Sequence, residues 1–199
     1  MAEGPRPMPA FVRHIPNALS LSRILFVPVV CVLWLSALPH RAEWCAALFG
    51  VATLTDLFDG LIARRLGVVS RFGAFLDPVT DKLLVCSCLV LLSSTYTSLA
   101  FMACTITVVA REIAVSALRE WMAQCGKRDD VQVGTLGKYK TASQLAAIWL
   151  FFALPAIPAE SALGPVVSGV ADALLYTSTA LSSLSMVLYF RAARDSLFG

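Results

Sequence analysis

The chain has 199 residues, of which 58% are hydrophobic and only 15% are charged, and its formal net charge is +3. A soluble domain has about a quarter of its residues charged, so this composition argues against an ordinary soluble protein. The small net charge also argues against a nucleic-acid partner. Apolar stretches near the roughly 20 residues that span a bilayer separate the charged clusters. We therefore expect a polytopic membrane protein with a single domain over residues 1–199.

Two interpretations of the N-terminal segment, residues 1–14, stay open. Phe11 and Ile15 flank Arg13 and His14, which is typical of a short amphipathic element along the cytoplasmic interface. A plain tail fits the proline-rich, weakly basic composition equally well. No small-residue cleavage site follows the first apolar run, so we expect that run to stay as a span.

Hydropathy predicts six membrane-spanning helices, because only helices and closed barrels satisfy the backbone in lipid and runs of this length favour helices. They cover residues 19–38, 44–64, 72–93, 98–122, 138–154 and 166–190. The predicted fold class is therefore all-α: a polytopic membrane bundle of six transmembrane helices with a short N-terminal interfacial segment.

The basic residues orient this bundle. They cluster before the first span, between spans two and three, between spans four and five, and after the sixth, whereas the opposite loops hold only Arg41. Lys and Arg are enriched in cytoplasmic loops, so both termini are predicted to be cytoplasmic. A bacterial inner membrane is the first choice of location because the chain is short and lacks an Arg/Ser-rich transit peptide. An organellar membrane stays open as the alternative.

Four carboxylates lie within one short segment, DLFDGLIARRLGVVSRFGAFLDPVTD. Asp56 and Asp59 are three residues apart and Asp77 and Asp81 are four apart, so each pair shares one face of a helix. The short connection Arg65–Arg71 makes the two helices antiparallel neighbours. All four carboxylates are therefore expected to converge near the cytoplasmic surface.

Close carboxylates repel one another, and one or two divalent cations would remove that repulsion. Oxygen-only ligands suit Mg²⁺, Mn²⁺ or Ca²⁺ better than zinc or copper. The alternative is a set of capping or salt-bridged aspartates, which is disfavoured because capping needs one Asp for each helix end. Small residues near the acidic faces, Gly60, Ala63 and Gly73, either pack the helices or leave room for a bulky ligand beside the metal.

The segment fills every position of the pattern D-x2-D-G-x2-A-R-x8-G-x3-D-x3-D. This pattern resembles the signature of the CDP-alcohol phosphatidyltransferases. The segments IPNALSLSRILFVP, RFGAFLDPVTDK, AREIAVSALREWMAQCGKR and GKYKTASQ are similar to the branch of that family whose acceptor is sn-glycerol 3-phosphate. The likeness covers most of residues 11–150 and implies a six-helix membrane bundle, often a homodimer in contact with membrane lipid, whose active site opens to the cytoplasm.

The resemblance implies an enzyme that transfers the phosphatidyl group of CDP-diacylglycerol to the sn-1 hydroxyl of sn-glycerol 3-phosphate, giving phosphatidylglycerophosphate and CMP. It implies two divalent cations, Mg²⁺ or Mn²⁺, held by Asp56, Asp59, Asp77 and Asp81, with Asp81 also the general base. The family motif further implies a CDP-diacylglycerol site made by Asp56, Gly60, Ala63, Arg64 and Gly73.

The acceptor carries a phosphate group of its own, so its binding site needs cationic side chains. Arg111 and Arg119 share a helix face two turns apart, and Lys138 opens the fifth span, where a helix N-terminus attracts anions. Arg111 lies deep enough in its span to need a partner, but the neighbouring Glu112 is expected to point about 100° away. We assign the glycerol 3-phosphate site to Arg111, Arg119 and Lys138, with Arg23 as a further member.

Two rival functions stay in view. A sister enzyme would take another acceptor: inositol phosphate, phosphatidylglycerol or serine. A divalent-cation transporter would use the four aspartates as its ion site, but such sites usually lie near the bilayer midplane rather than beside a basic cytoplasmic loop.

Overall fold

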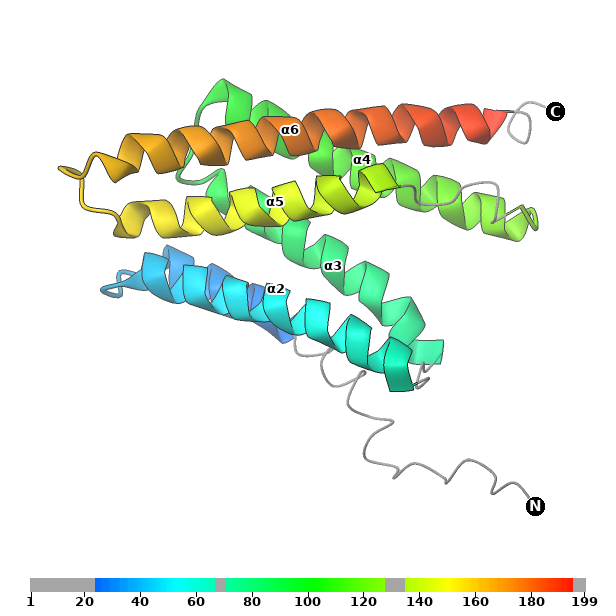
Figure 1. Ribbon diagram of the computed structural model, residues 1–199, viewed down its shortest axis with the longest axis horizontal. Helices are drawn as coiled ribbons and strands as arrows, with labels where there is room; N and C mark the ends of the chain where they lie inside the picture. The colour runs from blue at the N-terminus through cyan, green and yellow to red at the C-terminus, as the bar shows by residue number, and fades with distance from the viewer. Residues whose placement is uncertain (1–23, 67–70, 128–134, 195–199) are drawn as a thin grey trace, which may run out of the picture. The chain divides into compact units, whose positions relative to one another are not determined.

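The computed structural model describes residues 24–66, 71–127 and 135–194 (Figure 1). Within these ranges the side chains of residues 56–66, 71–74, 77, 135 and 136 are not described, so only their backbone is considered. The N-terminal segment 1–14 and Arg23 lie outside the described residues. The chain divides into two compact units, Met1–Ser87 and Cys88–Gly199, each of which is treated by itself.

All the regular structure described is helical. The first described helix, Ile24–Leu35, precedes five long helices and one short 3₁₀ turn. In chain order these are α2 (Arg41–Leu66), α3 (Arg71–Leu92), α4 (Leu99–Gln124), α5 (Thr135–Ala153), the 3₁₀ turn η2 (Leu154–Ala156) and α6 (Leu163–Ala192). The bounds of α2 to α6 agree with the predicted spans to within three residues at each end.

In the first unit, the first helix packs against α2. Val30 and Trp34 lie one turn apart and are buried, as are Cys45 and Phe49 of α2. The Cys45 thiol donates to the carbonyl oxygen of Val30, with an Sγ–O distance of 3.9 Å. Equal spacing of these apolar side chains on both helices explains why the two faces meet.

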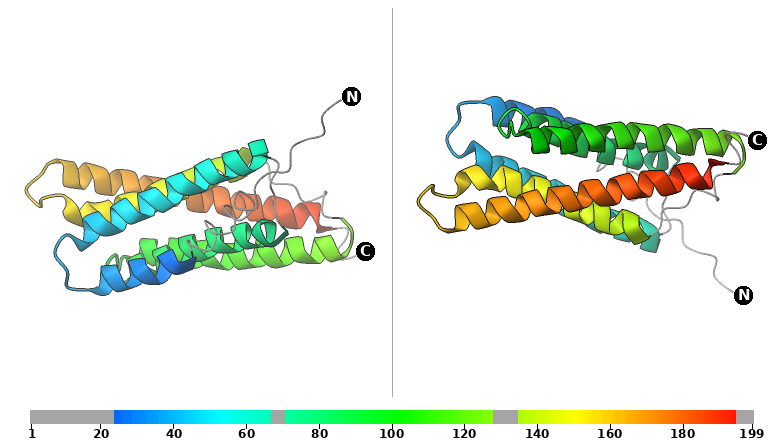
Figure 2. Two further views of the ribbon diagram at one scale, coloured as in Figure 1. Left: turned by 90° about the horizontal axis from the view of Figure 1, so that it is seen from below. Right: turned by 90° about the horizontal axis from the view of Figure 1, so that it is seen from above.

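In the second unit, α6 packs against both α4 and α5 (Figures 1 and 2). The buried residues of α4 recur every three or four positions and form one face: Phe101, Thr105, Val108, Arg111, Val115, Leu118 and Met122. The buried face of α6 is narrower and rich in small polar residues: Ala171, Leu175, Ser178, Ser182, Ser185 and Tyr189. Small residues let helix backbones approach closely, which is typical of membrane helix packing.

The two ends of this unit are held by different contacts. At one end, the Tyr96 hydroxyl donates to the Phe151 carbonyl oxygen at 2.7 Å, and the rings of Phe101 and Phe151 meet edge to face at 5.0 Å. At the other end, Met122 of α4 and Tyr189 of α6 belong to one buried apolar cluster. The C-terminal ends of α4 and α6 therefore lie together, and α5 runs antiparallel to both.

A glycine ends α4. Gly126 has a φ of 72°, a left-handed conformation that residues with a Cβ adopt at a cost. It lets the amide of Gly126 donate to the Ala123 carbonyl and the amide of Lys127 donate to that of Met122. These two bonds form a Schellman motif, which satisfies carbonyls that the helix leaves unpaired.

The outer surface of the helices is apolar. Large side chains such as Ile106 and Ile113 of α4 are 65% exposed, and Val166 and Leu184 of α6 are at least half exposed. Soluble monomers rarely expose contiguous apolar surface on this scale. Both α4 and α6 are long and apolar enough to cross a membrane. The all-α fold class is confirmed for the described part of the chain, whereas the number of six spans stays a prediction.

Candidate active site

The four predicted metal ligands lie on two consecutive helices. Asp56 and Asp59 fall in α2, and Asp77 and Asp81 fall in α3. Both stretches are helical, so the spacings of three and four residues do put each pair on one helix face, as predicted. The side chains of the first three acids lie outside the described residues, and so do residues 67–70, which join the helices. The convergence of all four carboxylates therefore remains a prediction.

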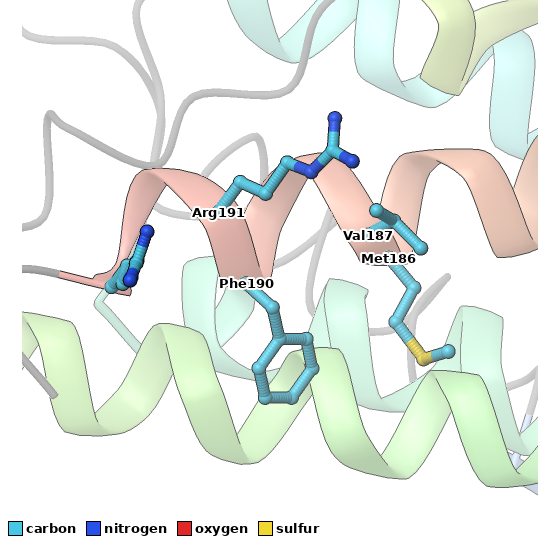
Figure 3. A pocket seen from close by; sticks show the side chains of 5 residues that line it. Met186, Val187, Phe190 and Arg191 are labelled. Atoms are coloured by element: carbon cyan, nitrogen blue, oxygen red, sulfur yellow. The ribbon is translucent and has the colours of Figure 1, made fainter.

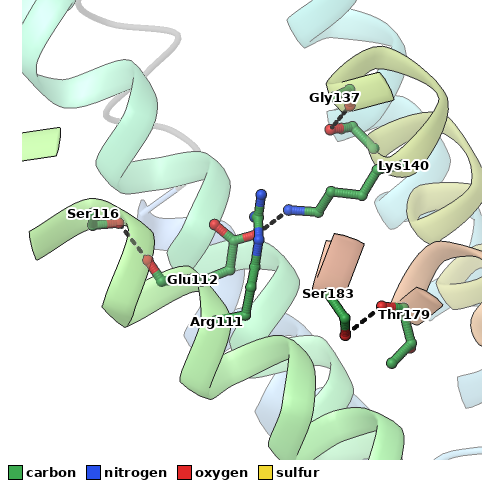
Figure 4. A network of polar contacts seen from close by, with 8 residues as sticks. Arg111, Glu112, Ser116, Gly137, Lys140, Thr179 and Ser183 are labelled. Atoms are coloured by element: carbon green, nitrogen blue, oxygen red, sulfur yellow. Dashed lines mark hydrogen bonds and ion pairs between the residues drawn. The ribbon is translucent and has the colours of Figure 1, made fainter. Parts of the chain in front are cut away.

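A buried charged network lies in the second unit (Figure 4). The Nη1 atom of Arg111 lies 2.5 Å from Oε1 of Glu112, and the Lys140 ammonium group donates to the same carboxylate oxygen. Arg111 and Lys140 are only 7% and 5% exposed. One carboxylate thus joins two cations from α4 and α5, and the three groups carry a net charge of +1.

The expectation that Glu112 points away from Arg111 is wrong. Adjacent residues do leave a helix about 100° apart, but the long guanidinium arm of Arg111 bends back toward the carboxylate. The ammonium group of Lys140 reaches the same oxygen from α5 and draws the Glu112 side chain inward. Burying a charge without a partner costs much free energy. The side chains therefore bend away from the directions in which they leave the helix and form the network.

A groove on α6 is the second feature of this unit. It is lined by Met186, Val187, Phe190, Arg191 and Arg194 at the C-terminal end of the helix (Figure 3). Both arginines are exposed. Apolar side chains beside exposed cations at the end of a long apolar helix are typical of a membrane–water boundary.

Comparison with known proteins decides the family. The family model described as CDP-alcohol phosphatidyltransferase matches residues 13–184. The chain is 40% identical over 185 residues to the CDP-diacylglycerol–glycerol-3-phosphate 3-phosphatidyltransferase of Sodalis glossinidius, with 93% of this chain and 97% of the relative covered. It is 41% identical to the enzymes of that name from Pectobacterium atrosepticum and Escherichia coli, with 92% of this chain and 97% of each relative covered.

The chain belongs to the CDP-alcohol phosphatidyltransferase family. It is therefore an enzyme, a transferase, and the resemblance drawn from the pattern of four aspartates is confirmed. Membership of this family, together with the apolar helices α4 and α6, also makes it a membrane protein.

The donor set of this CDP-alcohol phosphatidyltransferase fits a divalent cation. Four carboxylates supply oxygen ligands only, which Mg²⁺ and Mn²⁺ prefer. Asp81, the one acid of the four whose side chain is described, is exposed.

The predicted acceptor residues of the phosphatidyltransferase have different environments. Arg111 is buried in the network, Arg119 is half-buried two turns further along α4, and Lys138 is exposed. The predicted CDP-diacylglycerol residues Gly60, Ala63, Arg64 and Gly73 lie in α2 and α3, and their side chains are outside the described set.

Lys140 is the residue that the sequence interpretation left out. It stands two positions after Lys138 and so faces a different side of α5, where it is buried. A signal was present in the sequence. Lys140 and Gln144 are one turn apart in a largely apolar span, and both polar side chains are buried. Two polar residues on one face of an apolar helix indicate an interior site.

Proposed function

We propose that this chain transfers the phosphatidyl group of CDP-diacylglycerol to the sn-1 hydroxyl of sn-glycerol 3-phosphate, giving phosphatidylglycerophosphate and CMP. The observation that carries the choice of acceptor is the buried pair of cations, Arg111 and Lys140, around a single carboxylate. Two buried cations that meet at one carboxylate form an arrangement that suits a phosphate. Relatives named for this reaction match nearly the whole chain, which supports the same choice.

The donor site is assigned to the first unit. Asp56, Asp59, Asp77 and Asp81 would hold two divalent cations, Mg²⁺ or Mn²⁺. When bound, such cations supply positive charge that polarises phosphorus and stabilises a phosphate leaving group. The nucleotide would lie against the small residues Gly60, Ala63 and Gly73, with Arg64 and Asp56 beside it.

In the transfer itself, the sn-1 oxygen of the acceptor forms a bond to the phosphatidyl phosphorus. The bond from that phosphorus to the oxygen of CMP breaks, and CMP leaves. The carboxylate of Asp81 receives the proton of the sn-1 hydroxyl. Correct placement of that hydroxyl matters at least as much as basicity, because held reactants avoid the entropy cost of meeting.

The acceptor phosphate is assigned to Arg111, with Arg119, Lys138 and Arg23 as the further cations. Lys140 joins this set because it shares a carboxylate oxygen with Arg111. Arginine suits the site because its planar fork matches the oxygens of a phosphate. Serine has no phosphate for these cations to bind, whereas inositol phosphate would suit them.

The enzyme is assigned to the bacterial inner membrane, as a bundle of six spans with both termini and the active site facing the cytoplasm. Its helix bounds and the one-sided distribution of Lys and Arg support this topology. A homodimer in contact with membrane lipid is the proposed assembly.

The test is an acceptor assay. Purified full-length protein receives CDP-diacylglycerol, Mg²⁺ and one acceptor at a time, and CMP release is measured. We expect release with sn-glycerol 3-phosphate and none after the metal is removed with a chelator. Release with inositol phosphate, phosphatidylglycerol or serine, and none with glycerol 3-phosphate, would overturn the proposal.

A further inference from the structure

Among the described residues of the second unit, three buried polar atoms have no hydrogen-bond partner. They are Nε of Arg111, Nε2 of Gln144 and Oγ of Ser182. The three side chains come from α4, α5 and α6 and are 7%, 3% and 0% exposed. Leaving such a group unpaired costs roughly 1–3 kcal/mol, so three of them within one small unit require an explanation.

Gln144 and Arg111 come from two helices that both pack against α6, and they lie at neighbouring levels of the second unit. Two contacts fix the register: Lys140 meets Glu112, and Phe151 meets Phe101. Since Lys140 is eleven residues before Phe151 and Glu112 is eleven residues after Phe101, the antiparallel register is the same at both points. Because the two helices are antiparallel, one turn forward along α5, from Lys140 to Gln144, corresponds to one turn back along α4, from Glu112 to Val108. Gln144 therefore lies at the level of Val108.

The packing of α4 on α6 brings Ser182 to the same level. Val115 and Tyr189 belong to one cluster on two helices that run in the same direction. Ser182 lies seven residues before Tyr189, and Val108 lies seven residues before Val115. Seven residues are about two turns on either helix, so Ser182 faces the α4 segment between Val108 and Arg111.

The chemistry of the three atoms specifies their missing partner. The Nε atom of Arg111 and the amide nitrogen of Gln144 can only donate, and the Ser182 hydroxyl can donate as well. The group that they lack must therefore be an acceptor. Because one of these donors belongs to the positively charged guanidinium group of Arg111, an anion suits the position better than a neutral acceptor.

We propose that Gln144 and Ser182 bind the phosphate group of the acceptor in the core of the second unit, together with Nε of Arg111. This inference rests on the proposed function, since it supplies further ligands for the same substrate. Gln144 and Ser182 are then binding residues that select an acceptor carrying a phosphate.

The kinetic test uses the full-length enzyme with Gln144→Met and Ser182→Ala. Each change removes a donor and nearly keeps the volume. We expect the KM for sn-glycerol 3-phosphate to rise about tenfold, the size of one hydrogen bond to a charged group, while the KM for CDP-diacylglycerol is unchanged. The matched controls are Ser183→Ala, whose hydroxyl donates to the Thr179 carbonyl, and Gln124→Met at the exposed end of α4. An unchanged KM in both variants would overturn the proposal.

A binding test needs no turnover and so separates this inference from the proposed function. Inorganic phosphate should raise the unfolding temperature of the wild-type protein, and glycerol should not. Gln144→Met and Ser182→Ala should lose most of the phosphate shift, whereas Ser183→Ala should keep it. If all variants keep the full shift, a buried water rather than an anion pairs these atoms and the proposal fails. Loss of the shift supports it, even where the wild-type enzyme turns over a different phosphorylated acceptor.

Discussion

At the scale of single residues, Glu112 has the largest structural role that the described side chains reveal. Its carboxylate holds Arg111 and Lys140 together, and its backbone carbonyl accepts a hydrogen bond from the hydroxyl of Ser116. One acid therefore allows two cations to stay inside a helical unit whose other described buried side chains are uncharged. The same contacts bring two buried cations together, which suits a phosphate.

Glu112→Gln should destabilise the protein strongly. The change keeps the shape of the side chain but leaves two buried cations facing each other, and removing one member of a buried ion pair costs about 3–5 kcal/mol. The free energy of unfolding in mixed detergent micelles measures this loss. Glu120→Gln, at an exposed position of α4, is the control and should have little effect. Equal stability of the two variants would contradict the structural role of Glu112.

Asp81→Asn should reduce turnover by about 10²–10⁴-fold, the usual contribution of a positioned acid or base. The protein should still insert and fold, because the Asp81 side chain is exposed. CMP release and the unfolding temperature are measured together. Glu160→Gln, in the exposed connection between η2 and α6, is the control for loss of a carboxylate. Wild-type turnover in Asp81→Asn would contradict the role of Asp81 as general base.

We expect the folded protein to lose stability in alkali because Tyr96 ionises. Burial, and secondarily the negative charge of Asp172, raise the pKa of the Tyr96 hydroxyl to about 12 from its ordinary value of 10.0. The folded protein therefore holds this proton more tightly than the unfolded chain does. The resulting stabilisation is complete below pH 10 and is lost as the pH rises through about 12. Between these pH values the free energy of unfolding should decline more steeply with pH for the wild type than for Tyr96→Phe. Parallel curves would contradict this account.

At the scale of elements, α6 is the helix around which the second unit is organised. Its buried face has serine at three of six positions, and one of these hydroxyls, that of Ser178, donates to the carbonyl oxygen of Leu175 at 2.9 Å. Small side chains allow α4 and α5 to approach this face closely. The opposite face carries large apolar side chains such as Leu184 and Val187, which suit lipid.

Ser178→Leu should separate α6 from its neighbours. Ser178 is fully buried, and a larger side chain in a packed core costs about 1–3 kcal/mol. Thr177→Leu, on the exposed face one position earlier, should change stability by less than about 0.5 kcal/mol. The unfolding temperatures of the two variants are compared in one detergent. If Thr177→Leu is the more harmful change, the assignment of the two faces is wrong.

At the scale of the whole molecule, the proposed topology makes opposite predictions for two loops. Cys125 follows α4 and is exposed, so the six-span arrangement puts it in the cytoplasm. The connection that contains Glu160 lies on the other side. With the other five cysteines replaced by alanine, an impermeant maleimide should label Cys125 only in permeabilised spheroplasts. Glu160→Cys, with all six native cysteines replaced, should be labelled in intact spheroplasts.

Labelling of both positions from the same side would contradict a membrane span between α4 and the η2–α6 connection. Labelling with the two sides exchanged would keep the spans but reverse the orientation. Either result would move the active site away from the cytoplasmic surface, where sn-glycerol 3-phosphate is expected.

The sequence by itself determined the helices, their bounds and the family. Apolar runs of the length of a membrane helix and a complete acidic pattern are local features, so they can be read without knowing which helices touch. Asp56, Asp59, Asp77 and Asp81 were placed on helix faces by spacing alone, and the helical backbone of α2 and α3 confirms this placement.

Only the tertiary structure decided which polar side chains meet. Nothing in the spacing of Lys140, Gln144 and Ser182 relates the three residues to one another, and they become a candidate phosphate site because α4 and α5 both pack against α6. Glu112 turns toward Arg111 because Lys140 arrives from another helix. Spacing along one helix specifies the directions of its side chains, but the partners of a long, flexible side chain depend on the neighbouring helices, and their register is set by contacts far apart in the chain.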